Sequence, residues 1–220
     1  MLEGWKEVQP HFDKRFNIQD IFKRSNETYW FNFLIRLAEL SKISSSVFNP
    51  KQIINKVKND PFTAKWEFEL IEYFKKKKIK IVDSESKITE TGNNLDFQIN
   101  LKNENVFVEA NVQFLKEKEW NNGKAKFAPI DALIPVRIAN KVNKNKIKNS
   151  ELPVILAIDG TYSGLDSINL QSCGDKDIKE CISGVLIKTN SGFNFSKNKN
   201  ARYSLTDKQI NQLMGKKDEK

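Results

Sequence analysis

Apolar side chains recur at helical spacing in the N-terminal part of the chain. In segment 27–42 they fall at i, i+3, i+4, i+7 and i+10, which predicts the stripe of an amphipathic helix. The residues of this stripe are Trp30, Phe33, Leu34, Leu37 and Leu40. With a shorter helix near 18–24, this pattern predicts that residues 1–58 form a helical portion packed on a larger domain of residues 59–214. Residues 215–220 are expected to be a disordered tail.

A second helix is expected from Pro61 to about Lys76. Pro61 suits the first helical position because its missing N–H would have no partner there. Glu67 shares a stripe of this helix with three apolar residues at i+3, i+4 and i+7, which are Leu70, Ile71 and Phe74. An acid on a core-facing stripe is costly unless it has a partner. Glu67 is therefore a candidate site residue.

The remaining pattern alternates between strands and one basic helix. Strands are expected at "IKIVDS", in a hairpin at 95–114, at the continuous apolar run "LPVILAIDG" and at "SGVLIKT". The apolar run reads as a buried strand, parallel to a neighbour because it follows a helix. The order from about Pro61 to Asp159 is helix, three strands, helix, strand. It predicts an α/β protein with a mixed sheet in a three-layer α/β/α core.

The hairpin "LDFQINLKNENVFVEANVQF" has an unusual polar side. If the turn is 102–105, Ile99 pairs with Val108 and one face is uniformly apolar. The other face places Asp96 across from Asn111 and Gln98 across from Glu109, with Gln113 beyond. In this register Asp96 and Glu109 are diagonal neighbours, roughly 6–8 Å apart at the backbone, close enough for both carboxylates to contact one cation.

The side chains on this polar face favour a cation site over a solvated surface. The alternative is an ordinary hairpin with one face in water, which is common among antiparallel strands. A solvated face in so lysine-rich a chain would be expected to carry lysine and threonine, yet this face has two acids and three amides, with Phe107 and Asn100 nearer the turn. If the preceding helix packs on the same sheet, Glu67 would add a third carboxylate, and three acids would repel one another unless a divalent cation offset their charge.

Composition narrows the chemistry and the partner. A net charge of +9 points to a polyanion, nucleic acid before membrane, because no segment is a basic helix with an extended aromatic face. With one histidine and two cysteines lacking CxxC spacing, structural zinc, disulfides and a catalytic histidine pair are disfavoured. No apolar run approaches a membrane span or a secretory signal, so a cytoplasmic location is expected.

At this point the residues resemble the PD-(D/E)XK, or restriction-endonuclease-like, superfamily of nucleases. The resemblance rests on "KWEFELIEYF", "LDFQI" and "VFVEANVQF" in the order of the family's αβββαβ core. It implies that Asp96, Glu109, the carbonyl of Ala110 and the helix acid Glu67 bind Mg²⁺ or Mn²⁺. It also implies hydrolysis of phosphodiester bonds in nucleic acid, with DNA favoured, and restriction, defence or repair as the setting.

The basic helix expected between 130 and 149 would lie beside this site. Its cationic face recurs at i, i+4, i+7 and i+11 and could hold backbone phosphates; it consists of Arg137, Lys141, Lys144 and Lys148. Asp159, at the end of the apolar strand, is a minor site candidate. A homodimer is an open alternative, because nucleases that cut both strands of a duplex often dimerise.

Two positions depart from the family pattern. Leu95 replaces the proline, and Asn111 replaces the lysine that orients water and supplies positive charge. An amide can orient water but cannot supply the charge. Three alternatives follow: Lys141 or Lys144 reaches into the site, Asn111 and Gln113 orient water while the metal carries the charge, or the protein is a degraded nuclease that only binds nucleic acid or a protein partner.

Overall fold

The structure is a computed structural model that describes residues 61–87, 94–112, 147, 150–161, 166–168, 170 and 176–216. The chain divides into two compact units, Met1–Phe68 and Glu69–Lys220, and each is described by itself. Three predicted features lie outside the described residues: the helical portion 1–58, most of the basic helix, and residues 217–220 of the tail.

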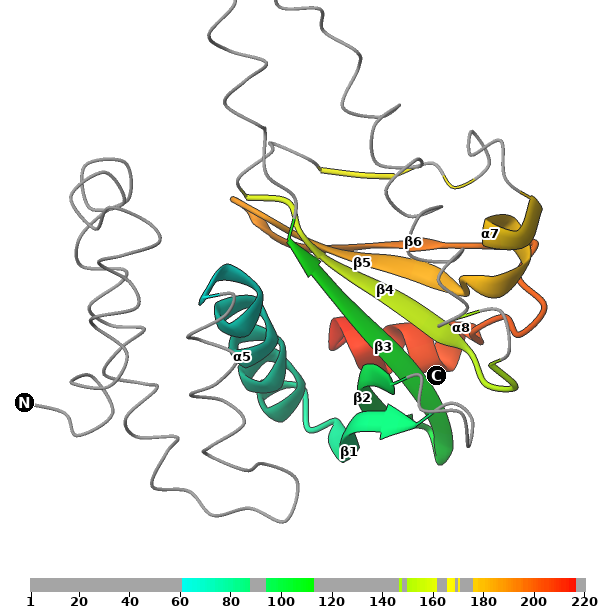
Figure 1. Ribbon diagram of the computed structural model, residues 1–220, viewed down its shortest axis with the longest axis horizontal. Coiled ribbons are helices and arrows are strands. Elements are labelled where there is room, and N and C mark those ends of the chain that lie inside the picture. Colours follow the sequence, from blue (N-terminus) through cyan, green and yellow to red (C-terminus); the bar gives the residue numbers. More distant parts are fainter. Residues whose placement is uncertain are drawn as a thin grey trace, which may run out of the picture. The chain divides into compact units, whose positions relative to one another are not determined.

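Six strands form one mixed sheet in the order in which they occur along the chain (Figure 1). They are β1 (Lys80–Lys87), β2 (Asn94–Leu101), β3 (Glu104–Val112), β4 (Val154–Asp159), β5 (Gly184–Thr189) and β6 (Gly192–Lys197). The pairs β3–β4 and β4–β5 are parallel, and the other three pairs are antiparallel. The predicted α/β class with a mixed sheet is confirmed, including the parallel strand at the apolar run.

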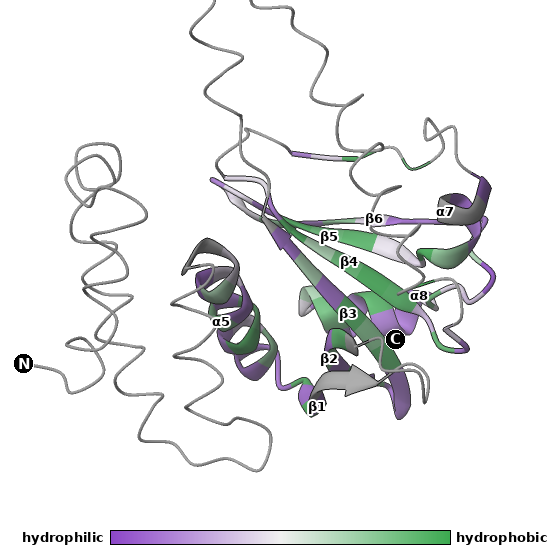
Figure 2. Cartoon of the chain, viewed as in Figure 1, coloured by the Kyte–Doolittle hydropathy of each residue, from purple (hydrophilic) through white to green (hydrophobic). Residues whose placement is uncertain are grey.

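The middle of the sheet is the most apolar part of the described chain. All six residues of β4 are buried, as are five of the six in β5, and Figure 2 shows hydrophobic colour along both strands. Continuous apolar runs suit strands that are covered on both faces, because neither side chain direction then meets water. The apolar sequence of β4, "VILAID", therefore favours a position in the middle of the sheet for that strand.

Two helices cover one face of the sheet. Within the second unit, α5 (Pro61–Lys76) contacts this face through Phe74, whose ring meets that of Phe97 edge to face at 6.3 Å. Tyr73 stacks on Phe193 of β6 at 4.0 Å between ring centroids. The Tyr73 hydroxyl donates to the Leu213 carbonyl of α8 (Asp207–Met214) at 2.8 Å, which links the two helices.

The opposite face packs against segments from the later part of the chain. Its core combines Phe107 of β3 with residues of β4 and β5 and with apolar residues outside the sheet, including Ile147, Ile168, Leu170 and Ile182. Gln98 pairs with Phe107 and alternates with Phe97 along β2, so this face is the one turned away from α5. Both faces of the sheet are thus covered.

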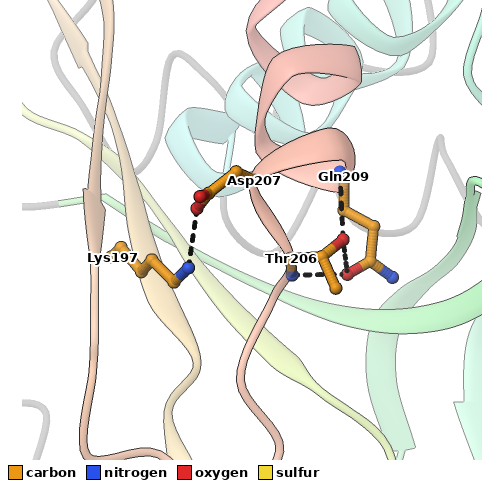
Figure 3. A network of polar contacts seen from close by, with 4 residues as sticks. All are labelled: Lys197, Thr206, Asp207 and Gln209. Carbon is orange, nitrogen blue, oxygen red and sulfur yellow. Dashed lines mark hydrogen bonds and ion pairs between the residues drawn. The ribbon is translucent and has the colours of Figure 1, made fainter.

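Helix α8 and strand β6 are elements that the hydrophobic pattern did not predict. Thr206 caps α8 through a capping box, in which the Gln209 N–H donates to Thr206 Oγ1 at 3.3 Å and the Thr206 N–H donates to Gln209 Oε1 at 2.8 Å (Figure 3). Lys197 Nζ donates to Asp207 Oδ1 at 2.8 Å, which ties the end of β6 to the first turn of α8. This hydrogen bond and the lysine charge hold the pKa of the Asp207 carboxyl below its usual value.

The hairpin between β2 and β3 has a tighter turn than predicted. Lys102 and Asn103 alone form it, with φ of 50° and 69°, so Ile99 pairs with Val106 and not with Val108. A two-residue turn of this kind requires positive φ at both central residues. Asparagine tolerates that conformation, but a lysine at the first position does not indicate such a turn in the sequence. The predicted register was therefore wrong by two residues, but an even shift preserves which side chains share a face.

Candidate functional site

The candidate site lies at the edge of the sheet where the parallel strands end. Val112 of β3 pairs with Asp159 of β4, and Asp159 pairs with Lys188 of β5. Strand β2 runs antiparallel to β3, so its first residues lie at this same edge. Open α/β sheets commonly bind ligands outside the carboxyl ends of their parallel strands. The polar residues gathered here are therefore in the position that a ligand site would take.

Asp96 is fixed to the main chain of β3. The backbone N–H of Ala110 donates to Asp96 Oδ2 at 2.7 Å. The β2–β3 ladder ends at Phe97 with Val108, and Asp96, the preceding residue of β2, lies beyond it. The prediction that Gln98 faces Glu109 was wrong, because the two-residue turn moves β3 along β2 and Gln98 pairs with Phe107. The predicted pairing of Asp96 with Asn111 rested on the same register. Asp96 bonds the main chain of the residue that follows Glu109, so it lies close to the backbone of Glu109.

Glu109 lies on a central strand among apolar neighbours. Its side chain is 1% exposed, and it pairs with Leu156 of β4 and follows Phe107 on the same face. Removing a carboxylate from water costs free energy unless hydrogen bonds or a cation compensate. A buried acid beside a second, anchored acid is the kind of pairing that functional sites use. Asn111, on the same face as Glu109, is half-buried.

Glu67 is buried at 6% exposure, as its place on the apolar stripe predicts. Glu69 and Glu72, which lie off this stripe, are half-buried. Glu67 belongs to the unit Met1–Phe68, whereas Asp96 and Glu109 belong to Glu69–Lys220, so its contribution to the site stays a prediction. Glu69 pairs with Lys188 at 2.7 Å.

Asp159 is the residue that the sequence reading undervalued. It is 1% exposed, and its Oδ1 accepts hydrogen bonds from the N–H of Thr161 at 3.1 Å and from Thr161 Oγ1 at 2.5 Å. Its Oδ2 is buried, and within the described residues no group donates a hydrogen bond to it. The sequence signal for Asp159 is an acid that ends a fully apolar run directly before glycine. An ordinary turn after a strand has the same pattern, so the sequence alone does not distinguish a site residue from a turn residue.

Several predicted site residues lie outside the described part of the chain. They are Gln113 and the cationic residues Arg137, Lys141, Lys144 and Lys148. Among the described residues, no group of three or more His, Cys, Asp and Glu side chains is placed to hold a metal ion. In the same residues, no helix is long and apolar enough to cross a membrane.

The donors that are present suit a magnesium ion more than other metals. Asp96, Glu109 and the Ala110 carbonyl offer hard oxygen atoms, and Mg²⁺ is commonly held by one or two carboxylates together with waters and substrate phosphates. Asp96 Oδ2 accepts the hydrogen bond from the Ala110 N–H. A pair of carboxylates is the ligand number that Mg²⁺ uses when substrate and water complete its shell, and it is too few for a closed all-protein cage.

Comparisons with known proteins give little further information. No family model matches the chain, and no curated protein matches it. Among solved structures, that of Pyrococcus furiosus SfsA in complex with Ca²⁺ is similar at 15% identity and a TM-score of 0.28. The match covers 67% of this chain and 64% of that one, so the chain spans somewhat less than two thirds of the matched structure. A likeness at this TM-score carries no argument about fold or function.

Proposed function

We propose that the protein is a metal-dependent nuclease that hydrolyses phosphodiester bonds of nucleic acid, with DNA as the favoured substrate. The observation that carries this proposal is that Asp96 bonds the Ala110 N–H at 2.7 Å at the carboxyl edge of the sheet, directly after the buried acid Glu109 in β3. The order α5, β1, β2, β3 and β4 also agrees with the αβββαβ core of the PD-(D/E)XK family. The second helix of that core would fall in residues 113–146, outside the described part.

The residues have distinct roles in this reading. Asp96 and Glu109 would hold Mg²⁺ or Mn²⁺, and Ala110 would contribute its carbonyl oxygen. When bound, such an ion polarises the scissile phosphate and lowers the pKa of the attacking water. Asn111 would orient that water through its amide, since it lies two residues after Glu109 on the same face of β3. Because an amide is neutral, positive charge toward the transition state must come from elsewhere.

The net charge of +9 supports a polyanionic substrate. Lys141, Lys144 and Gln113 remain proposed contributors to the site, and Arg137 and Lys148 proposed phosphate contacts. These residues are testable one by one, because each can be replaced without touching the acid pair. Equal cleavage by Lys141→Ala and Lys144→Ala would remove the idea that one of them replaces the family's lysine.

The direct test is cleavage of end-labelled single-stranded and double-stranded DNA, and of RNA, by the full chain with Mg²⁺ or Mn²⁺. The nuclease reading expects cleavage by the wild type and at least about a hundredfold loss in Glu109→Gln, which keeps the size of the side chain but removes its charge. Equal activity of both proteins would assign the cleavage to a contaminant and reject the proposal.

A second candidate is a non-catalytic module that keeps the nuclease-like fold and binds nucleic acid or a protein. The specific observation in its favour is Asn111, a neutral residue where the family has lysine. This candidate expects the wild type to bind DNA yet to cut no substrate with any divalent cation. The two candidates therefore differ in turnover, not in binding.

A further inference from the structure

A dense group of exposed lysines surrounds the C-terminal end of α8, far from the acid pair. We name it the basic surface and define it by its six members: Lys75, Lys76, Lys78, Lys80, Lys102 and Lys216. All six are exposed. They come from three places in the chain: the end of α5 and the start of β1, the turn between β2 and β3, and the residues after α8. No ion pair within the described residues involves Lys75, Lys76, Lys78, Lys80 or Lys216.

Specific contacts bring these three places together. Lys77, in the turn after α5, donates from Nζ to the Met214 carbonyl at the end of α8 at 3.0 Å. The N–H of Lys102 donates to Gln212 Oε1 of α8 at 2.7 Å. Lys80 begins β1 and pairs with Asn100, two residues before Lys102. The lysines thus occupy one region, because α8 is bound to both of the other places.

Two of these lysines adopt a backbone conformation that lysine disfavours. Lys78 has φ of 56° and Lys102 has φ of 50°. Among the described residues the only other non-glycine residue with positive φ is Asn103. Left-handed φ values favour glycine or asparagine, because a Cβ crowds the following carbonyl. Lysine at both positions is therefore less stable than glycine or asparagine would be, but it adds a positive charge.

Helix electrostatics explain only part of the group. Lys75 and Lys76 lie in the last turn of α5, where cations stabilise the helix dipole. This explanation does not reach Lys80, on a strand, or Lys102, in a hairpin turn. Glu104, two residues after Lys102, is engaged by Gln209 Nε2 at 2.9 Å. Five members of the surface, Lys75, Lys76, Lys78, Lys80 and Lys216, thus present positive charge that no ion pair within the described residues offsets.

We propose that the basic surface binds the phosphate backbone of a nucleic acid. Lysine ammonium groups on flexible stems contact phosphates as point charges and carry no base specificity. A lipid membrane is the poorer partner, since membrane-binding surfaces add apolar side chains that insert, and the exposed large hydrophobic residues of the described chain are only Val82 and Tyr203.

The location of the surface extends the proposed function and does not depend on it. Lys102 lies six residues along β2 from Asp96, which corresponds to roughly 20 Å at about 3.3 Å per residue. Nucleic acid bound here would be held at that distance from the acid pair, so binding at the surface needs neither the acids nor a metal. The two proposals can therefore fail separately.

The test is fluorescence anisotropy of a labelled 20-base-pair DNA duplex, and of a single-stranded RNA of the same length, with the full chain in EDTA. The salt concentration is varied so that the slope of log K against log salt counts phosphate contacts. Wild type is compared with Lys78→Gly, Lys102→Gly and Lys78→Glu. Lys199→Ala is the control, because Lys199 is also exposed but follows β6, at the other side of the sheet from β2.

We expect Lys78→Gly and Lys102→Gly each to bind several-fold more weakly and to lower the salt slope by about 0.9. Their Tm should equal that of the wild type or exceed it by up to about 4 °C, because glycine adopts a positive φ without strain. Lys78→Glu should bind more weakly still, and Lys199→Ala should match the wild type. Unchanged affinity and salt slope in both glycine variants would overturn the proposal, as would binding of the wild type to anionic lipid vesicles but to neither nucleic acid.

Discussion

The N–H of Ala110 donates to the carboxylate of Asp96 at 2.7 Å, just beyond Phe97 and Val108, where the ladder of β2 and β3 ends. A side chain of one strand thereby bonds the main chain of the next. This contact holds one acid beside Glu109, whose side chain is 1% exposed. Asp96 is thus expected both to stabilise the sheet edge and to bind a cation.

The two roles of Asp96 can be separated by substitution. Asp96→Asn keeps an oxygen that can accept the Ala110 N–H, so we expect nearly unchanged stability but loss of Mn²⁺ binding and cleavage. Asp96→Ala removes the acceptor and should lower the free energy of unfolding by about 1–2 kcal/mol as well. Urea unfolding and calorimetry measure the two effects. Equal loss of stability in both variants would contradict the assigned hydrogen bond.

Asn111 offers a gain-of-function prediction. Asn111→Lys places a positive charge on the Glu109 face of β3, where the developing charge of a phosphoryl transition state would be stabilised. We expect the cleavage rate of Asn111→Lys to exceed that of the wild type by about tenfold or more. Asn111→Met is the control of similar length without charge. A rate no higher than that of the methionine variant would show that the site has no use for a cation at this position.

Tyr73 makes stability depend on pH at the alkaline end. Burial raises the pKa of its phenol to about 12, above the usual value of about 10. The folded state holds this proton more tightly than the unfolded state, so the stabilisation is complete below about pH 10 and is lost as the pH rises through about 12. Tyr73→Phe should lose about 1 kcal/mol at neutral pH, with the Leu213 hydrogen bond. The difference between the two proteins should shrink from pH 10 upward, and a constant difference would contradict this account.

Gly184 is required by the close approach of β5 and β6. A Cβ at this position would collide with the ring of Phe195 and lie 2.9 Å from the Ser196 carbonyl oxygen. Gly184→Ala should therefore cost about 1–3 kcal/mol in urea unfolding. Adding Phe195→Leu should recover only part of this loss, because the contact with the main chain remains. An alanine variant as stable as the wild type would show that β6 can move aside freely.

The sequence predicts side-chain faces better than it predicts register. Leu95, Phe97, Ile99 and Leu101 are all buried, as the alternation along β2 requires. The pairing partner of Ile99 was nevertheless missed, since the conformation of Lys102 depends on neighbours such as Gln212 that no local pattern names. Glu109 nevertheless stays on its predicted face, because a register shift of two residues preserves the alternation of side chains.

Elements near the C-terminus show a different limit. None of the six residues of β6 is buried, and the strand lacks the apolar run that identified β4 and β5. The capping box of Thr206 and Gln209 was readable, yet the helix that follows has only eight residues. Short elements of this kind are stabilised mainly by packing, here by the Tyr73 contact with Leu213. Such tertiary contacts cannot be inferred from periodicity.

The central claim is that Asp96 and Glu109 together bind a divalent cation, and calorimetric titration of Mn²⁺ into the full chain tests it most directly. We expect one saturable site in the wild type and no measurable binding in Glu109→Gln or Asp96→Asn, with far-UV circular dichroism unchanged in both variants. Wild-type protein that binds no Mn²⁺, or variants that bind it as tightly as the wild type, would contradict the claim.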